Sequence, residues 1–230
     1  MKYINTSLIK VSLAITLAFS SYAQAIIIND VGDDFSVNWS YAVPSSTGTV
    51  SATATFDITT INASQLIMDI FIDNTTTLGD LGNAGLASFG FNINPDAASA
   101  SISGGSVFDS TGTEQNLPSI DNNIDVCIWA ANNCQGGAQN SLLAALANDT
   151  FTLTLNFAGN NLANFEMDTF GVKFQTGKGS FELEGCVSTD TSCTTTRVPE
   201  PGSLALLGLG LAGLGFARRK KWHTRQDSNL

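Results

Sequence analysis

Carboxylates are the side chains of this 230-residue chain whose number and spacing could support chemistry. The chain has 20 Asp and Glu but one histidine, His223, which lies among the last eight residues. Ser-His-Asp and Cys-His catalysis and histidine-rich metal sites are therefore excluded from any domain that precedes it. Asp69 and Asp73 would lie about 13 Å apart on one strand, beyond the roughly 5–9.5 Å that paired glycosidase carboxylates need. Glu182 and Glu184, about 6.6 Å apart, fall within that range.

The alternation around Glu182 and Glu184 offers a simpler explanation for this second pair. Both glutamates alternate with Phe181 and Leu183, which is typical of the solvent-facing side of a strand. We therefore assign no catalytic residue and predict that the protein is not an enzyme. An acid-only carbohydrate-active enzyme stays open as an alternative, and it would use these two glutamates.

An acidic cluster near the N-terminus is the remaining candidate for a ligand site. Asp30, Asp33 and Asp34 lie close together in the chain, with Gly32 able to turn it. Calcium takes six to eight oxygen ligands, and three carboxylates at a chain terminus are too few. The glycine-rich stretches also lack the Lys-Ser/Thr pair of a phosphate loop. We predict no metal site and no cofactor.

The four cysteines form two pairs with the same spacing. Six residues separate Cys127 from Cys134, and six separate Cys186 from Cys193. In an exported chain, four cysteines indicate two disulfides with three possible connectivities, of which we favour the two local ones. Zinc sites space their ligands by two to four residues and often include histidine, so the pattern disfavours zinc.

The N-terminal segment has the three parts of a secretory signal peptide. Lys2 and Lys10 supply positive charge, Val11–Phe19 is an uncharged apolar run, and Ala23 and Ala25 form a small-x-small cleavage site. The apolar run is far shorter than the ~20 residues that a membrane-spanning helix needs. We predict that residues 1–25 are removed after export through Sec-type machinery.

Residues 26–197 form the predicted exported domain. It has three cations against 18 acids, a net charge of −15, which excludes a nucleic-acid partner. Apolar residues alternate with Thr, Ser, Asn and Asp, so the segment is predicted to form half-buried antiparallel strands. Turn signals such as Gly177-Lys178-Gly179 and Thr111-Gly112 separate the runs, and Ser141–Ala147 is the one helix candidate. We expect an all-β, antiparallel β-sandwich, with a jelly roll as one possible form, of about eight to ten short strands. The clearest runs are Phe35–Tyr41, Thr49–Thr59, Gln65–Asp73, Phe89–Ile93, Ile124–Ile128, Phe151–Phe157, Phe170–Phe174 and Phe181–Leu183.

The C-terminal segment contains a second apolar run that precedes four consecutive cations. Leu204–Ala217 is rich in Gly and Leu, and Arg218, Arg219, Lys220 and Lys221 follow it. Fourteen helical residues span roughly 21 Å, short of the ~30 Å bilayer core. The cations fit the positive-inside rule, which would leave residues 222–230 as a cytoplasmic tail. We expect a short transmembrane helix, the only contact of the protein with the membrane.

The residues before that run carry a recognisable motif, Val198, Pro199, Glu200 and Pro201. Together with the helix and the basic cluster, residues 198–221 resemble the PEP-CTERM sorting signal of exosortase substrates. The tail at 222–230 is longer than is usual for that family. The resemblance implies processing by an exosortase, an inner-membrane precursor, and a final place at the cell surface or outside a Gram-negative bacterium that makes extracellular polysaccharide.

The sequence therefore predicts an exported surface or matrix protein with a structural or adhesive role, sorted through its C-terminal signal. Extracellular polysaccharide is a candidate partner. A carbohydrate-binding module is an alternative, and it predicts that Trp39 or Trp129 is exposed on a sheet face.

Overall fold

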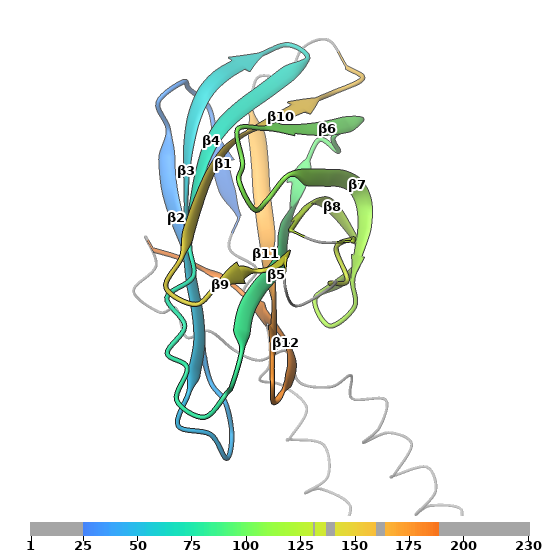
Figure 1. The fold of residues 1–230 in the computed structure, drawn as a ribbon. Coiled ribbons are helices and arrows are strands. Elements are labelled where there is room, and N and C mark those ends of the chain that lie inside the picture. The colour runs from blue at the N-terminus through green and yellow to red at the C-terminus, as the bar shows by residue number, and fades with distance from the viewer. Residues whose placement is uncertain (1–24, 131, 137–140, 160–163, 189–230) are drawn as a thin grey trace, which may run out of the picture.

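The computed structural model describes residues 25–130, 132–136, 141–159 and 164–188, and all of its regular elements are strands (Figure 1). The strands are β1 (Ile26–Ile28), β2 (Asp34–Ala42), β3 (Thr49–Asn62), β4 (Gln65–Asp73), β5 (Ala84–Asn94), β6 (Ser99–Ser103), β7 (Ser110–Leu117), β8 (Asp121–Trp129), β9 (Leu143–Ala144), β10 (Asn148–Asn156), β11 (Phe165–Thr176), β12 (Gly179–Glu184) and β13 (Cys186–Val187).

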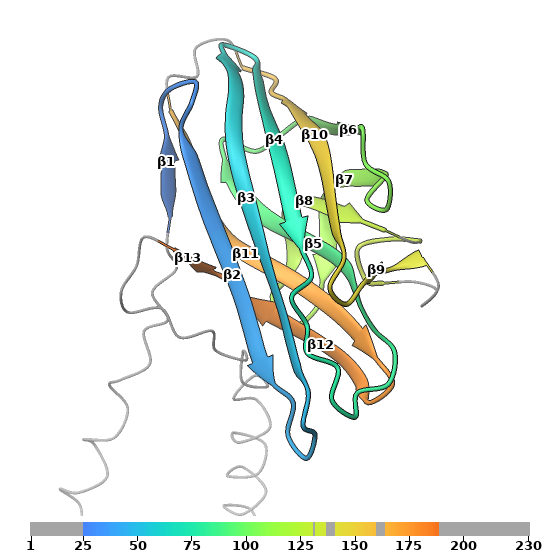
Figure 2. The same cartoon turned by 60° about the vertical axis from the view of Figure 1, so that its left-hand side comes forward.

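These strands form two antiparallel sheets. The six-stranded sheet has the order β13-β2-β3-β4-β10-β6. The seven-stranded sheet has the order β1-β11-β5-β8-β7, with β12 also paired to β11 and β9 paired to β5. Figure 2 shows the two sheets as layers, with β2, β3 and β4 in front of β11 and β12. The prediction of an antiparallel all-β domain is confirmed.

The core lies between the two sheets and consists of the alternating apolar residues of both. Phe35 of β2 stacks on Phe56 of β3, with ring centroids 4.6 Å apart. Phe56 in turn contacts Phe91 of the opposite sheet at 6.0 Å. All three rings are at most 6% exposed, so these contacts join the inner faces of the two layers.

The helix candidate Ser141–Ala147, for which a loop was the alternative, does not form a helix. The segment contains strand β9, in which Leu143 and Ala144 pair with Leu86 and Gly85 of β5. A seven-residue helix gains few internal hydrogen bonds for the cost of nucleation, whereas pairing with β5 buries Leu143 fully. The expected count of eight to ten strands is also too low, because five short or polar strands escaped the periodicity.

The outer face of the seven-stranded sheet is covered as well. Leu117, Ile124, Cys127 and Cys134 form a second apolar cluster there. Two glycines allow this close cover. A Cβ at Gly90 would lie 2.5 Å from the Val126 carbonyl oxygen, and one at Gly171 would lie 2.5 Å from Leu117 Cδ2. This sheet is therefore buried on both sides where Leu117 and the turn between β7 and β8 lie against β11.

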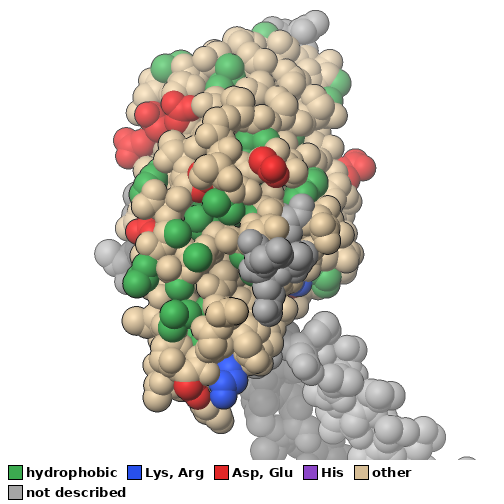
Figure 3. Space-filling model, viewed as in Figure 1, with side chains coloured by type: hydrophobic (Ala, Val, Ile, Leu, Met, Phe, Trp, Pro, Cys, Tyr) green, Lys and Arg blue, Asp and Glu red, His purple; other side chains and the backbone are tan. Residues whose placement is uncertain are grey.

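The surface of the described residues carries few cations. Figure 3 shows scattered Asp and Glu side chains and few Lys or Arg on the face it presents. Within the part of the chain that the structure describes, no helix is long and apolar enough to cross a membrane. The predicted short helix after Ser203 lies outside the described residues.

Candidate functional site

The C-terminal end of the domain is fixed to the six-stranded sheet. Strand β13 pairs with β2 through Cys186 and Asn38, and the Ser188 N–H donates a hydrogen bond of 2.9 Å to the Ser36 carbonyl. Ten peptide steps follow before Val198, which limits their separation to about 35 Å. Val198–Pro201 and the cluster Arg218–Lys221 lie outside the described residues. The sorting motif can therefore lie at most about 35 Å from the end of the described domain.

The first strand of the domain begins beside the predicted cleavage position. Strand β1 begins at Ile26, directly after Ala25, and pairs with Met167 of β11. Ile28 is fully buried in the core. Cleavage after Ala25 would leave the whole strand in place, and Ala23 itself lies outside the described residues.

Glu182 does not lie on a solvent-facing surface, contrary to the prediction. Its carboxylate accepts a hydrogen bond of 2.6 Å from Lys173 Nζ and another of 2.5 Å from the Ser119 N–H. The side chains of Glu182 and Lys173 are only 6% and 11% exposed. The turn between β7 and β8 lies against this face of β12 at Ser119, so the carboxylate joins that turn to β12.

Glu184, the other half of that pair, lies near Asp168 instead. Burial raises the pKa of Glu184, and the charge of Asp168 raises it further. Burial also raises the pKa of Asp125 on β8, against the lowering effect of the Ile93 N–H. Because these pKa values are raised by folding, both groups favour the folded state at acidic pH, and the effect is lost as pH rises through the raised values. No pattern in the sequence points to Asp125 and Asp168, which come from strands that are not neighbours.

Asp69 and Asp73 remain apart, as the strand spacing predicts. Both lie on the outer face of β4 with Phe71 between them, and the Thr152 hydroxyl donates to Asp69 at 2.6 Å. Near the N-terminus, the N–H groups of Asn29 and Asp30 donate to Asp33 and lower its pKa. In the described ranges, no three His, Cys, Asp or Glu side chains form a group that could hold a metal ion.

The cysteines at 127 and 134 form the predicted local disulfide. Their Cα atoms are 6.0 Å apart, and both residues are buried in the second apolar cluster. Cys186 is disulfide-bonded as well, while Cys193 lies outside the described residues.

Replacing both Cys127 and Cys134 with alanine should lower the free energy of unfolding by about 2.5 kcal/mol, because the bridge closes a short loop in the unfolded chain. Urea denaturation of the oxidised variant and wild type measures the difference. Reduction of the wild type should produce a loss at least as large. Four free thiols in the purified protein would contradict the prediction.

Neither Trp39 nor Trp129 is an exposed platform. Trp39 is 1% exposed, and its indole N–H donates a hydrogen bond of 3.1 Å to the Phe170 carbonyl across the core. Trp129 is half-buried and packs on the second apolar cluster. The exposed Trp39 that the alternative of a carbohydrate-binding module predicts is not present, because its position on β2 faces inward.

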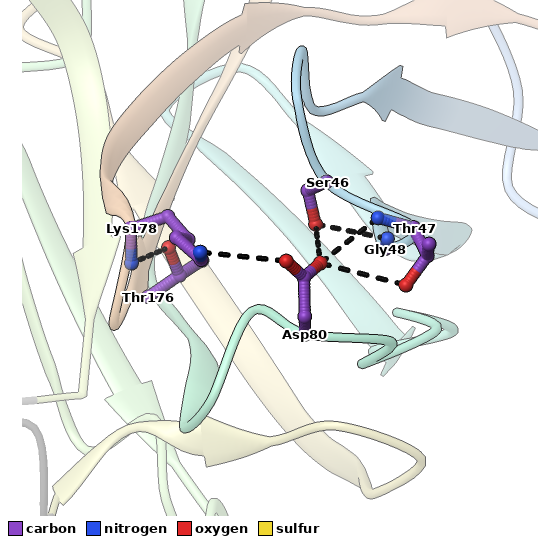
Figure 4. A network of polar contacts seen from close by, with 6 residues as sticks. All are labelled: Ser46, Thr47, Gly48, Asp80, Thr176 and Lys178. Atoms are coloured by element: carbon purple, nitrogen blue, oxygen red, sulfur yellow. Dashed lines mark hydrogen bonds and ion pairs between the residues drawn. The ribbon is translucent and has the colours of Figure 1, made fainter.

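A network around Asp80 fixes three turns at one end of the sheets (Figure 4). The Ser46 hydroxyl and the Thr47 N–H both donate to Asp80, and they hold its pKa well below its usual range. Lys178 adds an ion pair at 3.4 Å. The same loop contributes Leu78 to a half-open pocket of about 300 Å³. The network therefore holds in place the turns beside this pocket.

The fold and the terminal segments define the class: a β-sheet domain followed by a sorting signal. Residues 197–221 match the PEP-CTERM protein-sorting motif. This motif marks an exported protein that is directed to the cell surface and processed by an exosortase. No curated protein and no solved structure matches the chain.

Proposed function

We propose that this chain is made as an inner-membrane precursor, cut by an exosortase beside Val198–Pro201, and displayed as a non-catalytic structural or adhesive domain. The observation that carries the proposal is the sorting motif at residues 197–221, close behind a folded domain that ends at β13.

The chemistry of the motif supports recognition by a protease. Pro199 and Pro201 fix φ near −65° and push the residues before them towards extended geometry. An extended segment that is ordered in advance loses less entropy on entering a cleft. Glu200 supplies one charge that a pocket could pair.

The absence of a catalytic role is supported by the state of the candidate acids. Glu182 is occupied by Lys173 and by the Ser119 N–H, which is the environment of a structural ion pair. Asp69 and Asp73 are separated by an aromatic side chain on a flat face. Neither pair leaves two carboxylates facing one another.

Replacing Pro199, Glu200 and Pro201 together with alanine should leave the protein at precursor mass in the inner membrane. Immunoblots of membrane and surface fractions measure this. A matched variant with alanine at Thr194, Thr195 and Thr196 should be processed like wild type, because it alters the preceding segment and leaves the motif intact. Equal release of the motif variant and wild type would contradict the proposal.

A further inference from the structure

We infer that the outer face of the six-stranded sheet binds a neutral polysaccharide, with Phe71 as the ring on which a sugar stacks. The inference rests on the proposed display of the domain at the cell surface, where such polymers are encountered. It names a partner for a face that the sorting signal does not use.

The face is built from rows of side chains in register. One row runs across four neighbouring strands through Ser36, Thr55, Phe71 and Thr150. Because side chains alternate along a strand, these residues all project away from the core. Successive strands lie about 4.8 Å apart, so the row forms a shallow surface roughly 14 Å long. Its residues are hydroxyl-bearing except for the phenylalanine.

Phe71 is the one aromatic residue of this row. Its side chain is 43% exposed, whereas the inward residues of the same strand, such as Ile70 and Ile72, are fully buried. Its row neighbours Thr55 and Thr150 show that a strand-forming polar residue fits these positions. An aromatic ring presents a negative face, which attracts the slightly positive C–H groups of a pyranose ring.

Carboxylates that can accept hydrogen bonds from sugar hydroxyls lie on both sides of the ring. Asp69 and Asp73 lie two residues before and after Phe71 on the same face. The Thr152 hydroxyl holds Asp69 in place at 2.6 Å, and Asp69 retains capacity to accept further hydrogen bonds. Carboxylates form strong hydrogen bonds with hydroxyl donors, which are the groups at the edge of a sugar ring. Stacking and edge contacts together fit a sugar better than a purely apolar ligand.

The negative charge of the face determines which class of polysaccharide it can bind. Asp57, Asp69 and Asp73 lie on it, and both lysines of the described residues are engaged elsewhere: Lys173 pairs with Glu182 and Lys178 with Asp80. An anionic polymer would be repelled. A neutral polymer loses nothing by this charge and gains the carboxylate acceptors.

Retention of the exported protein on solid polysaccharides tests the inference. The probes are microcrystalline cellulose, chitin and cross-linked dextran as neutral polymers, alginate as an anionic one and chitosan as a cationic one. Wild type should be retained on at least one neutral polymer and not on alginate. Phe71→Ala should weaken that retention about tenfold, equal to roughly 1.4 kcal/mol. Phe71→Trp should preserve it.

Two further variants keep the test decisive. Asp73→Asn should weaken retention without removing the aromatic ring, and Leu146→Ala should change nothing, because Leu146 is an exposed apolar residue outside the sheet face. Equal urea midpoints would show that all variants fold.

Two results would overturn the inference: no retention on any neutral polymer, including retention on chitosan alone, or equal retention of Phe71→Ala and wild type. The mass of the same preparation shows separately whether the protein has been cut by the exosortase. An uncut protein that still binds cellulose would contradict the proposed function but not this inference.

Discussion

Replacing Lys173 with methionine should lower the free energy of unfolding by about 3 kcal/mol. The substitution leaves the carboxylate of Glu182, 6% exposed, without its counter-charge beneath the β7–β8 hairpin. The Ser119 N–H alone would then stabilise a nearly buried anion. Urea denaturation of the purified exported protein measures the loss.

Two matched variants show whether that loss of stability comes from the unpaired charge of Glu182. Lys178→Met removes the other described ion pair, whose side chains are 48% and 49% exposed, and should change stability by less than about 1 kcal/mol. The double variant Lys173→Met, Glu182→Leu should be more stable than Lys173→Met, because it also removes the carboxylate that would otherwise be buried without a counter-charge. If Lys173→Met behaved like Lys178→Met, the buried pair would not stabilise the fold as described.

Asp149→Asn should be nearly as damaging, with a loss of about 3 kcal/mol. Asp149 is 5% exposed, and its carboxylate accepts hydrogen bonds from the N–H groups of Ser106, Val107 and Phe108 and from the Ser106 hydroxyl. An asparagine would turn an N–H₂ group towards these donors. Thermal and urea denaturation would measure the effect, and Asp109→Asn, an exposed change in the same loop, should stay within about 0.5 kcal/mol.

The cost of Asp149→Asn should depend on pH. Burial tends to raise the pKa of Asp149, but the hydrogen bonds from Ser106, Phe108 and Val107 outweigh it and leave the pKa below its usual value. The carboxylate therefore stabilises the fold above the ordinary carboxyl range, and this contribution is lost as pH falls through the lowered pKa. The difference between variant and wild type should shrink in acid. A difference independent of pH would contradict this role.

Strand β4 shows how much of the fold could be predicted from sequence. Every second residue from Leu66 to Ile72 is apolar and buried, and the predicted limits Gln65–Asp73 agree with the structure. The strand lies between β3 and β10 with one buried face, so its pattern reflects the burial of that face alone. The local disulfide of Cys127 was predictable for a similar reason, because its partner is close in the chain.

Strand β7 shows where this method fails. The sequence predicts a turn at Thr111-Gly112, but both residues lie inside the strand and pair with Ile128 and Cys127. An edge strand with no continuous apolar face leaves no period to detect. Gly112 is small because a Cβ there would lie 3.2 Å from Trp129 Cη2, a requirement of close packing rather than of a turn.

The misplaced Glu182 has the same kind of cause. Alternation states correctly which residues of β12 share a side, but it cannot state whether that side is covered. Here the turn between β7 and β8 lies against that side, and the contact with Ser119 joins residues 63 positions apart. Phe71 is the opposite case, since the strand was predicted while the exposure of its ring follows only from the open outer face.

The mass of the intact protein recovered from the cell surface tests the central claim most directly. The helix predicted at Leu204–Ala217 is about 9 Å shorter than a ~30 Å bilayer core. This length suits a sorting segment that is removed better than a permanent membrane anchor. We expect a chain that begins at Ile26 and ends near residues 198–202, without the segment Leu204–Lys221. A surface protein whose mass still includes Leu204–Lys221 would contradict the account and indicate a simple membrane anchor.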